Sequence, residues 1–513
     1  MAGRKKSMIR SEHLTDSGAR LSSASSPLVE SFSGASTDTR KVQPGEIFFC
    51  LKGPNFDAHD FASVALEKGA TGIVIEQGRE DDVTASLAES EPAWAQRMAL
   101  YLCEDPLKTM QDVARLHRRD QSYTVIAVTG SNGKTSAKEM LLGMLSELLG
   151  QSSVDATVGN LNNHIGVPLT LLNLKPGISH AIIEMGMNHA GEIDLLSSIA
   201  EPDHGLITSV GRAHIEFFYS KRGIARAKQE LMQYCKTSLC YPASAIGKTY
   251  LLRKSKDTNS RGKPAIALFG MADDPGWEAV PVRVRKQGLW KSLKGRDLQF
   301  GPSGLEFSLE SEDFQGKVIN QHYYSRVQAE NLLGCIATLN MAGFPLQSVQ
   351  EAARHAAPVS GGRFHILRKE NRILVDDTYN ANPDSFLAAI RSLRKMLPEG
   401  KLLCLAGQMA ELGSAGAAGH FEIGQILKED SYEIQAVGTD GARKYLEGFG
   451  KDLERMSEPG EHYRFFFPDS AELADHIERN SQYYLSFDGI LVKGSRSARM
   501  EQACEALKRI GYV

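Results

Sequence analysis

Residues 129–135, which read Thr-Gly-Ser-Asn-Gly-Lys-Thr, constrain the fold more than any other segment of the chain. Residues 123–129 are apolar and rich in β-branched side chains, which predicts a buried strand. Residues 136–149 repeat apolar side chains at helical spacing. A glycine-containing loop between a strand and a helix is typical of phosphate binding at a helix N-terminus. The segment therefore predicts an α/β domain built on a mainly parallel sheet.

Each part of this loop has a chemical task if the phosphate belongs to ATP. The two glycines allow backbone N–H groups to turn toward phosphate oxygens. The lysine side chain reaches the β- and γ-phosphates, and the threonine hydroxyl can ligate Mg²⁺. The alternative interpretation is a tight structural turn. We predict that ATP is bound by Gly130, Ser131, Asn132, Gly133, Lys134 and Thr135.

Composition excludes several classes of protein. The 59 basic and 62 acidic residues leave a net charge of −3, so no overall field favours nucleic acid. The seven cysteines form no Cys-x-x-Cys pair or zinc set, which indicates buried thiols in a reducing compartment. The basic first ten residues precede no apolar stretch, and no window approaches about 18 uninterrupted apolar residues. We expect a cytoplasmic protein without a nucleic-acid partner or a membrane-inserted segment.

The length of 513 residues is too great for one core and indicates about three domains. Residues 1–122 hold short β-like runs between turns, such as residues 46–51 and 72–76, and predict a small α/β domain. Residues 123–360 alternate strand and helix signals around the phosphate loop, as in βαβ units. Within them, residues 245–325 break the rhythm and predict an antiparallel elaboration. Residues 361–513 predict a separate, doubly wound domain of the Rossmann-like kind, with strands over residues 373–376, 402–405, 435–437 and 490–492.

The spacing of the phosphate loop narrows the chemistry. Only Ser131 and Asn132 separate Gly130 from Gly133, whereas the ordinary loop carries a longer spacer. The shorter loop resembles that of the Mur ligases and folylpolyglutamate synthases. Those enzymes make acyl phosphates from carboxylates and then form amides, so the resemblance implies an ATP-dependent amide ligase.

Such a reaction brings two anions together and needs cations and metal ligands. Glu184 ends a strand-like run, and His214 follows the next one, which places both at the carboxyl edge of the sheet. Thr135 in the loop is a third candidate. Lys228 lies in a helix-like segment, where a solvated charge is the alternative interpretation. The residues alone leave these alternatives open.

Further segments resemble Mur ligase signatures in family order, from about residue 36 to residue 501. They are residues 157–163, 183–193 and 213–216. The resemblance implies catalytic roles for the lysine of the loop and the three metal candidates downstream, and substrate contacts for two asparagines of the first segment. It also implies that Lys228 is carbamylated and becomes an anionic metal ligand. The implied catalytic residues are Lys134, Glu184, His214 and Lys228, with metal ligands Thr135, Glu184, His214 and Lys228, and substrate contacts Asn160 and Asn163.

Residues 36–40 resemble the Asp-Ser-Arg signature of the family's UDP-binding domain. Arg40 can pair with a pyrophosphate oxygen, and Thr39 can donate a hydroxyl hydrogen bond. The alternative is a turn before a strand. We expect Thr39 and Arg40 to bind substrate.

Five more residues match positions that contact nucleotide or substrate in the family. Asn331 matches a residue near adenine, although a helix-start asparagine is a simpler interpretation. Arg363 matches an interdomain arginine that can reach the γ-phosphate. Asp377 and Asn380 lie in an acidic, asparagine-rich turn after a strand-like run, and we assign both to nucleotide binding. Lys493 is assigned to substrate, with a solvated strand-end lysine as the alternative.

The same turn resembles the Mur ligases that add D-alanyl-D-alanine to UDP-N-acetylmuramoyl-tripeptide. This resemblance implies ATP and Mg²⁺ as cofactors, small-molecule substrates and a monomeric, three-domain α/β enzyme. One rival is a sister ligase that acts at the third peptide position or on folate and glutamate. A more distant rival is a regulatory or transport module that hydrolyses ATP without ligation.

Overall fold

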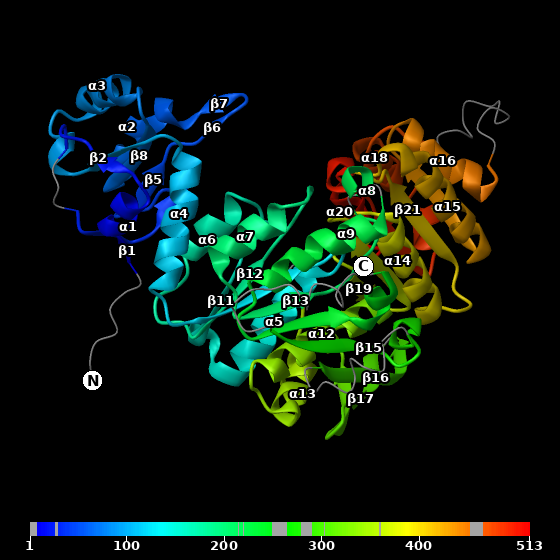
Figure 1. Cartoon of the computed structure of the whole chain (residues 1–513). Coiled ribbons are helices and arrows are strands. Elements are labelled where there is room, and N and C mark those ends of the chain that lie inside the picture. Colours follow the sequence, from blue (N-terminus) through cyan, green and yellow to red (C-terminus); the bar gives the residue numbers. More distant parts are fainter. Residues whose placement is uncertain are drawn as a thin grey trace.

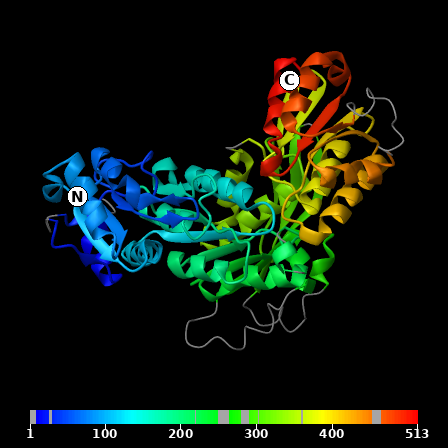
Figure 2. The ribbon, with the colours of Figure 1, turned by 90° about the horizontal axis from the view of Figure 1, so that it is seen from above.

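The computed structural model describes residues 8–25, 29–213, 215–218, 220–248, 264–278, 290–301, 303–358, 361–451 and 465–513. Three large sheets follow one another along this part of the chain. Figures 1 and 2 show the N-terminal and C-terminal sheets at opposite ends of the central one. The predicted α/β class is confirmed.

The N-terminal sheet has five strands in the order β2-β9-β8-β5-β4, and its strands are parallel except for β2. Helices α2 and α3 follow β5 and β8 in the chain. Two small two-stranded sheets, β1–β3 and β6–β7, flank it. The bounds are β1 Ile9–Arg10, α1 Ser11–Asp16, β2 Arg20–Leu21, β3 Ser31–Phe32, β4 Ala35–Ser36, β5 Ile47–Phe49, β6 Lys52–Gly53, β7 Phe56–Asp57, α2 Ala62–Glu67, β8 Gly72–Glu76, α3 Glu80–Ser90 and β9 Ala99–Cys103.

The central sheet has nine strands in the order β11-β12-β10-β13-β14-β15-β16-β17-β18. The strands from β11 to β16 are parallel, and β17 and β18 continue the sheet antiparallel. The bounds are β10 Thr124–Thr129, β11 Val154–Ala156, β12 His180–Glu184, β13 His204–Ile207, β14 Ser238–Pro242, β15 Ala265–Met271, β16 Trp290–Gly301, β17 Gly304–Glu310 and β18 Gln315–Asn320.

The prediction of an antiparallel elaboration over residues 245–325 is therefore wrong for β15, which joins the parallel sheet. Its residues are nearly all buried, as expected of a parallel strand covered on both faces. Among the described residues of this segment, only the pairs β16–β17 and β17–β18 are antiparallel. Residues 249–263 and 279–289 lie outside the described part.

Strand β10 shows why the middle of the central sheet is apolar throughout. Val125 and Ala127 belong to one buried cluster, whereas Ile126 and Val128 belong to another on the opposite face. Helices α6 and α7 line the first face and helices α5, α12 and α13 the second. The bounds are α5 Lys134–Leu149, α6 Gly166–Leu172, α7 Glu192–Ala200, α8 Ile215–Phe218, α9 Lys221–Lys228, α12 Arg326–Met341 and α13 Leu346–His355.

The C-terminal sheet has six strands in the order β19-β20-β24-β21-β22-β23, parallel except for β19. The strands predicted over residues 373–376, 402–405, 435–437 and 490–492 all form. The bounds are β19 His365–Lys369, β20 Arg372–Asp377, α14 Pro383–Met396, β21 Leu402–Gly407, α15 Gly416–Glu429, β22 Tyr432–Val437, α16 Asp440–Phe449, β23 Phe466–Phe467, α18 Ser470–Arg479, α19 Ser481–Leu485, β24 Gly489–Lys493 and α20 Glu501–Arg509.

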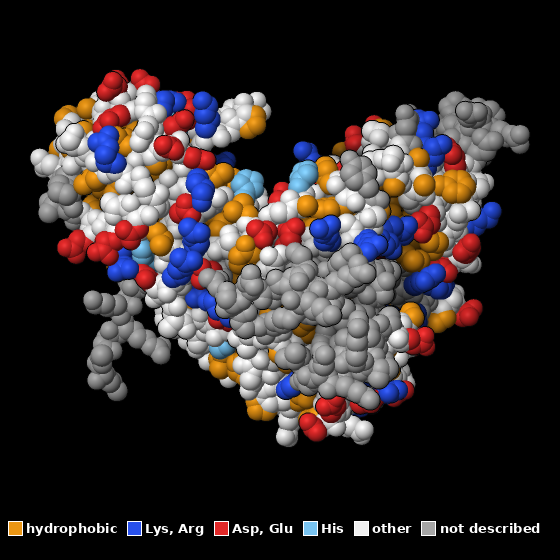
Figure 3. All heavy atoms as spheres, viewed as in Figure 1, with side chains coloured by type: hydrophobic (Ala, Val, Ile, Leu, Met, Phe, Trp, Pro, Cys, Tyr) orange, Lys and Arg blue, Asp and Glu red, His pale blue; other side chains and the backbone are white. Residues whose placement is uncertain are grey.

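Helix α4 (Pro106–Arg119) links the first two sheets and packs against α1 on one side and α6 and α7 on the other. Figure 3 shows a hollow between the N-terminal and C-terminal parts of the molecule. All seven cysteines are buried free thiols, as predicted. Within the described ranges, no helix is both long and apolar enough to cross a membrane.

Candidate functional site

The phosphate loop lies between the end of β10 and the start of α5, in the middle of the parallel strands. A Cβ at Gly130 would lie 1.9 Å from the Thr208 hydroxyl oxygen, so the loop backbone packs directly on the neighbouring strand end. Gly133 has a φ of 82°, and a Cβ there would lie 2.5 Å from the Asn331 side-chain amide. Both positions therefore require glycine, which is the condition for a closely wrapped anion-binding loop.

Lys134 keeps its ammonium over this loop. Its Nζ donates to the Gly130 carbonyl oxygen at 2.8 Å. Burial lowers the pKa of Lys134, and the positive charge of Arg363 lowers it further, against the opposing effect of Glu184. An ammonium in this position is a ready partner for a phosphate that enters the loop.

Glu184, at the end of β12, connects the phosphate loop to a second loop. Its Oε2 accepts from the Thr135 hydroxyl at 2.8 Å, and its Oε1 accepts from Asn162 Nδ2 at 2.8 Å. The Lys138 ammonium lies 4.0 Å from Oε2 and donates to the Thr157 carbonyl oxygen at 2.9 Å. The carboxylate is thus buried among donors from both loops.

Sequence reasoning missed Asn162 and Lys138. Asn162 lies inside the quoted 157–163 signature between the two asparagines that were assigned, so its position in a motif was visible. Lys138 stands one helical turn after Lys134, and that spacing was the available signal.

Thr135 and Glu184 present a hydroxyl and a carboxylate oxygen side by side, which is the donor chemistry that Mg²⁺ prefers. No group of three or more His, Cys, Asp or Glu residues gathers around a common point in the described ranges. Mg²⁺ usually completes its shell with substrate phosphates and water, so these two residues fit the ion when ATP is present. His214 lies outside the described residues.

Lys228 is the last residue of α9 and is 1% exposed. Burial, together with the nearby charge of Lys134, holds the pKa of its ammonium well below the usual range. The alternative interpretation of a solvated helix lysine is therefore wrong. A buried amine of this kind spends a larger fraction of time uncharged and nucleophilic.

Lys493, at the end of β24, is also buried, so the alternative of a solvated strand-end lysine is wrong. Its Nζ donates to Asp377 Oδ2 at 2.6 Å and to the Asn380 carbonyl oxygen at 3.0 Å. Asp377 Oδ1 accepts from the Phe364 N–H at 2.9 Å. The three predicted residues Asp377, Asn380 and Lys493 are thus brought together and fix one turn.

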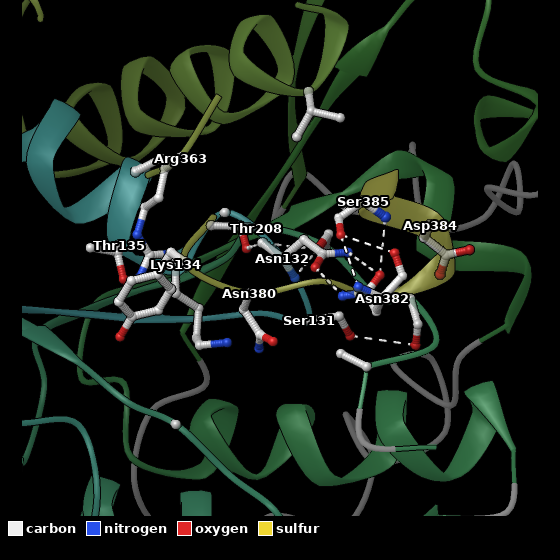
Figure 4. A pocket seen from close by; sticks show the side chains of 18 of the residues that line it. Ser131, Asn132, Lys134, Thr135, Thr208, Arg363, Asn380, Asn382, Asp384 and Ser385 are labelled. Carbon is white, nitrogen blue, oxygen red and sulfur yellow. Dashed lines mark hydrogen bonds between the residues drawn. The ribbon is translucent and has the colours of Figure 1, made fainter. Parts of the chain in front are cut away.

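The central and C-terminal parts contact each other beside the phosphate loop (Figure 4). Asn382 Nδ2 donates to Asn132 Oδ1 at 2.7 Å. The Arg212 N–H and Nε donate to the two oxygens of Asp384 at 2.7 and 2.8 Å. The same guanidinium donates to Glu422 at 2.6 and 3.2 Å. Of these five residues, Asn132 alone was assigned to the site from the sequence.

A cavity of about 740 Å³ opens between these parts. Most predicted nucleotide and substrate residues line it, together with Asn162, Tyr379, Asn382 and Asp384. The predicted residues on its wall are Ser131, Asn132, Gly133, Lys134, Thr135, Asn160, Asn163, Glu184, Asn331, Arg363, Asp377, Asn380 and Lys493.

Two asparagines of the cavity wall lie in or beside helices. Asn163 Oδ1 accepts from the Gly166 N–H at 2.8 Å at the start of α6. Asn331 lies inside α12, whose first turn is capped by the Ser325 hydroxyl, so the interpretation as a helix-start asparagine is wrong.

Thr39 and Arg40 lie apart from this cavity, in the loop after β4. Arg40 Nε and an η nitrogen donate to Asp38 at 2.9 and 2.8 Å, and the Arg40 side chain is 87% exposed. The Arg40 guanidinium holds the pKa of Asp38 down, at about 2. The structure places both predicted residues at the surface of the N-terminal part.

A phosphate loop on a parallel sheet, joined across a polar cavity to a Rossmann-like sheet, defines a nucleotide-using enzyme of three α/β parts. The chain matches the Mur ligase middle domain over residues 128–339 and the Mur ligase glutamate ligase domain over residues 362–496. It belongs to the Mur ligase family.

Relatives from several bacteria share one specific name. The UDP-N-acetylmuramoyl-tripeptide–D-alanyl-D-alanine ligase of Escherichia coli (strain K12) is 30% identical over 485 residues, which cover 93% of each chain. A crystal structure of MurF from Acinetobacter baumannii superposes with a TM-score of 0.77 at 25% identity, covering 98% of this chain and 99% of that one. The MurF ligase of Thermotoga maritima in complex with ADP gives 0.69 at 25% identity, covering 93% and 97%.

Proposed function

We propose that this protein joins D-alanyl-D-alanine to UDP-N-acetylmuramoyl-tripeptide at the expense of ATP, in peptidoglycan precursor synthesis. The observation that carries the proposal is the cavity in which the phosphate loop, the 157–163 loop and the Asp377–Asn380 turn meet. A ligase needs this arrangement because a phosphate donor, a carboxylate and an amine must react in one place. The full-length relatives with this activity support it.

In the first step, an oxygen of the tripeptide's terminal carboxylate attacks the γ-phosphorus of ATP. The bond from that phosphorus to the bridging oxygen breaks, which releases ADP and leaves an acyl phosphate. Lys134 and Arg363 hold the phosphates through the step, and the N–H groups of the loop accommodate the developing charge. Thr135 and Glu184 carry the oxygens that would hold Mg²⁺, which neutralises phosphate charge when it is bound.

In the second step, the free amine of D-alanyl-D-alanine attacks the acyl carbon. The carbon–oxygen bond to phosphate then breaks, phosphate leaves, and the amine loses its proton. Asp377, Asn380 and Lys493 shape the C-terminal wall of the cavity during this step. Enclosure between the central and C-terminal parts protects the acyl phosphate from water.

The other predicted contacts complete the substrate site. Asn160 and Asn163 face the cavity from the central part and suit the peptide end of the acceptor. Thr39 and Arg40 suit the UDP pyrophosphate, for which the exposed Arg40 exchanges its present partner, Asp38. Asn331 lines the cavity and keeps the adenine contact that the family resemblance implies.

A direct assay tests the function. Purified protein receives ATP, Mg²⁺ and UDP-N-acetylmuramoyl-tripeptide, with and without D-alanyl-D-alanine, while ADP and product mass are followed. We expect ADP release that depends on the dipeptide. The product should be heavier than the tripeptide substrate by the mass of two alanine residues. ADP release that ignores the dipeptide, without a gain in mass, would reject the proposal and favour a simple ATPase.

Carbamylation of Lys228 is part of the proposal. A neutral amine adds to CO₂, loses a proton and becomes a carbamate, whose oxygens can ligate a hard cation. The burial of Lys228 and its lowered pKa favour the neutral amine that this step needs. We expect Lys228→Ala to be inactive and short carboxylic acids to restore activity. Failure of every such acid to do so in a folded variant would count against the carbamate.

A further inference from the structure

Arg363 stands on a backbone stretch that one turn of the C-terminal part holds in place. Its neighbours Gly362 and Phe364 both have positive φ, 79° and 51°. The Tyr379 N–H donates to the Gly362 carbonyl oxygen, and the Phe364 N–H donates to Asp377 Oδ1, each at 2.9 Å. A non-glycine residue keeps such a conformation only where its surroundings determine it. The direction of Arg363 is therefore built into the fold.

The same turn also holds the end of the Arg363 side chain. Its guanidinium carbon lies 3.7 Å from the centroid of the Tyr379 ring, a close cation–π stack. Stacking covers one face of the guanidinium and leaves its N–H edges able to donate. No hydrogen-bond or ion-pair partner of this guanidinium occurs among the residues that the structure describes. Its donors are thus available to an anion.

The stack lies on the wall of the cavity beside the phosphate loop. Arg363, Tyr379 and Lys134 all line this cavity, and Figure 4 shows Arg363 next to Lys134 and Thr135. The charge of Arg363 acts on Lys134, whose pKa burial and this repulsion lower. Two cations brought together at one wall of a polar cavity suit a polyanionic ligand.

We propose that Tyr379 is a positioning residue: its ring stacks on Arg363 and aims the guanidinium edge at the terminal phosphate of ATP. The proposal rests on the proposed function, in which Arg363 binds nucleotide. It goes further, because it assigns the discrimination between ATP and ADP to a residue that contacts no phosphate group itself. The competing role for such a ring is stacking on the adenine base, and this role makes an opposite prediction.

Binding affinities for ATP and ADP separate the two roles. Titration calorimetry with full-length protein and Mg²⁺ measures both nucleotides on wild type, Tyr379→Leu and Tyr379→Phe. Loss of the ring in Tyr379→Leu should weaken ATP about tenfold and change ADP less than about twofold. ADP lacks the terminal phosphate, so it should not detect the misplaced guanidinium. Tyr379→Phe keeps the ring and should restore the wild-type ratio.

A double-mutant cycle with Arg363→Gln tests whether the ring acts through the arginine. In that background, Tyr379→Leu should change ATP affinity less than about twofold, because no guanidinium remains to be held. Phe466→Leu is the matched control. It removes the ring from the Arg443–Phe466 pair, 4.9 Å from carbon to centroid, and neither residue lines the cavity.

Three results would overturn the proposal. If Tyr379→Leu weakens the affinities for ATP and ADP equally, the ring acts on the base. If the ATP affinity is unchanged, the ring has no positioning role. If Tyr379→Leu has its full effect in the Arg363→Gln background, the two residues are not coupled. If thermal unfolding shows Tyr379→Leu to be misfolded, Tyr379→Gln gives the same comparison. A wild type that binds ATP but forms no product rejects the ligase function while the affinity ratio still judges Tyr379. A wild type that does not bind ATP overturns both.

Discussion

The junction between the N-terminal and central parts differs in chemistry from the junction between the central and C-terminal parts. At the first, a single buried apolar cluster runs from Phe32 through Met110 of α4 to Val125 and Leu171. At the second, among the described residues, the buried clusters of the C-terminal part stop short of those of the central sheet. The contacts there include the ion pairs around Arg212, the Asn132–Asn382 hydrogen bond, and the partly buried Tyr324, which packs against the C-terminal core.

Polar groups at the first junction also serve to fix its geometry. Arg118 is buried and donates to the Ala200 carbonyl oxygen at 3.1 Å and to Asp203 at 2.9 Å. The Asn173 amide accepts from the Ala35 N–H at 3.0 Å and donates to its carbonyl oxygen at 2.8 Å. It therefore completes the open edge of β4 as a further strand would.

The difference indicates which of the two junctions opens more easily. Separating a continuous apolar core exposes apolar surface to water, which costs about 25 cal/mol per Å². Solvent-exchangeable hydrogen bonds and ion pairs are each worth only about 1 kcal/mol net. The cavity lies at the second junction, so we expect substrates to enter where the parts separate most readily.

The largest expected effect is on catalysis at the polar junction. Lys134→Met removes the ammonium over the phosphate loop and should lower kcat/KM by about a thousandfold, or roughly 4 kcal/mol. The free energy of unfolding should not fall, because burial already disfavours this charge. Lys444→Met, at an exposed ion pair, is the control. A variant that loses stability in proportion to activity would contradict this division.

The second effect is on stability at the apolar junction. Met110→Ala creates a cavity in the shared core and should lower the free energy of unfolding by about 2–5 kcal/mol. We expect the N-terminal and central parts to unfold together, because one core spans them. Met396→Ala is the matched change in the C-terminal core. Calorimetry should show that it affects a different transition, and separate transitions for the first two parts would break the comparison.

A smaller effect is expected from Arg212→Ala, which leaves Asp384 and Glu422 without this partner. Loss of these partly exposed pairs should cost about 1 kcal/mol of docking and lower kcat several-fold. Small-angle scattering should show a larger radius of gyration, while the central part keeps its unfolding temperature. Arg509→Ala, which removes an exposed surface pair, should change neither quantity.

The last effect, which is negligible at pH 7, is a pH dependence of the apolar junction. Burial and the neighbouring His13 lower the pKa of His117 in α4 from 6.5 to about 4, with Asp120 opposing and Arg10 adding to the shift. The folded state thus binds fewer protons than the unfolded chain between these values. Stability is unaffected above pH 6.5 and falls toward pH 4, by at most about 1.4 kcal/mol per pH unit. Denaturant unfolding at pH 7, 6 and 5 should show this slope, and His117→Gln should flatten it.

Local sequence was sufficient for much of the fold and for the centre of the site. The strand before the phosphate loop, the glycines and the helix after it were predictable because backbone conformation there depends on adjacent residues. β8 matched its predicted bounds for the same reason. The parallel pairing of β15 was missed, because strand direction depends on partners that are distant in the sequence.

The sequence by itself determined the phosphate loop, the order of the parts and the likeness to the Mur ligases, since each is carried by contiguous residues. Only the tertiary structure decided that Lys228 and Lys493 are buried, because exposure depends on what other segments cover. It also decided the pairings of Arg212 with Asp384, 172 residues away, and of Asn132 with Asn382, 250 residues away. The stacking of Arg363 on Tyr379 was also decided by the tertiary structure, because the turn after β20 places Tyr379 against the segment before β19.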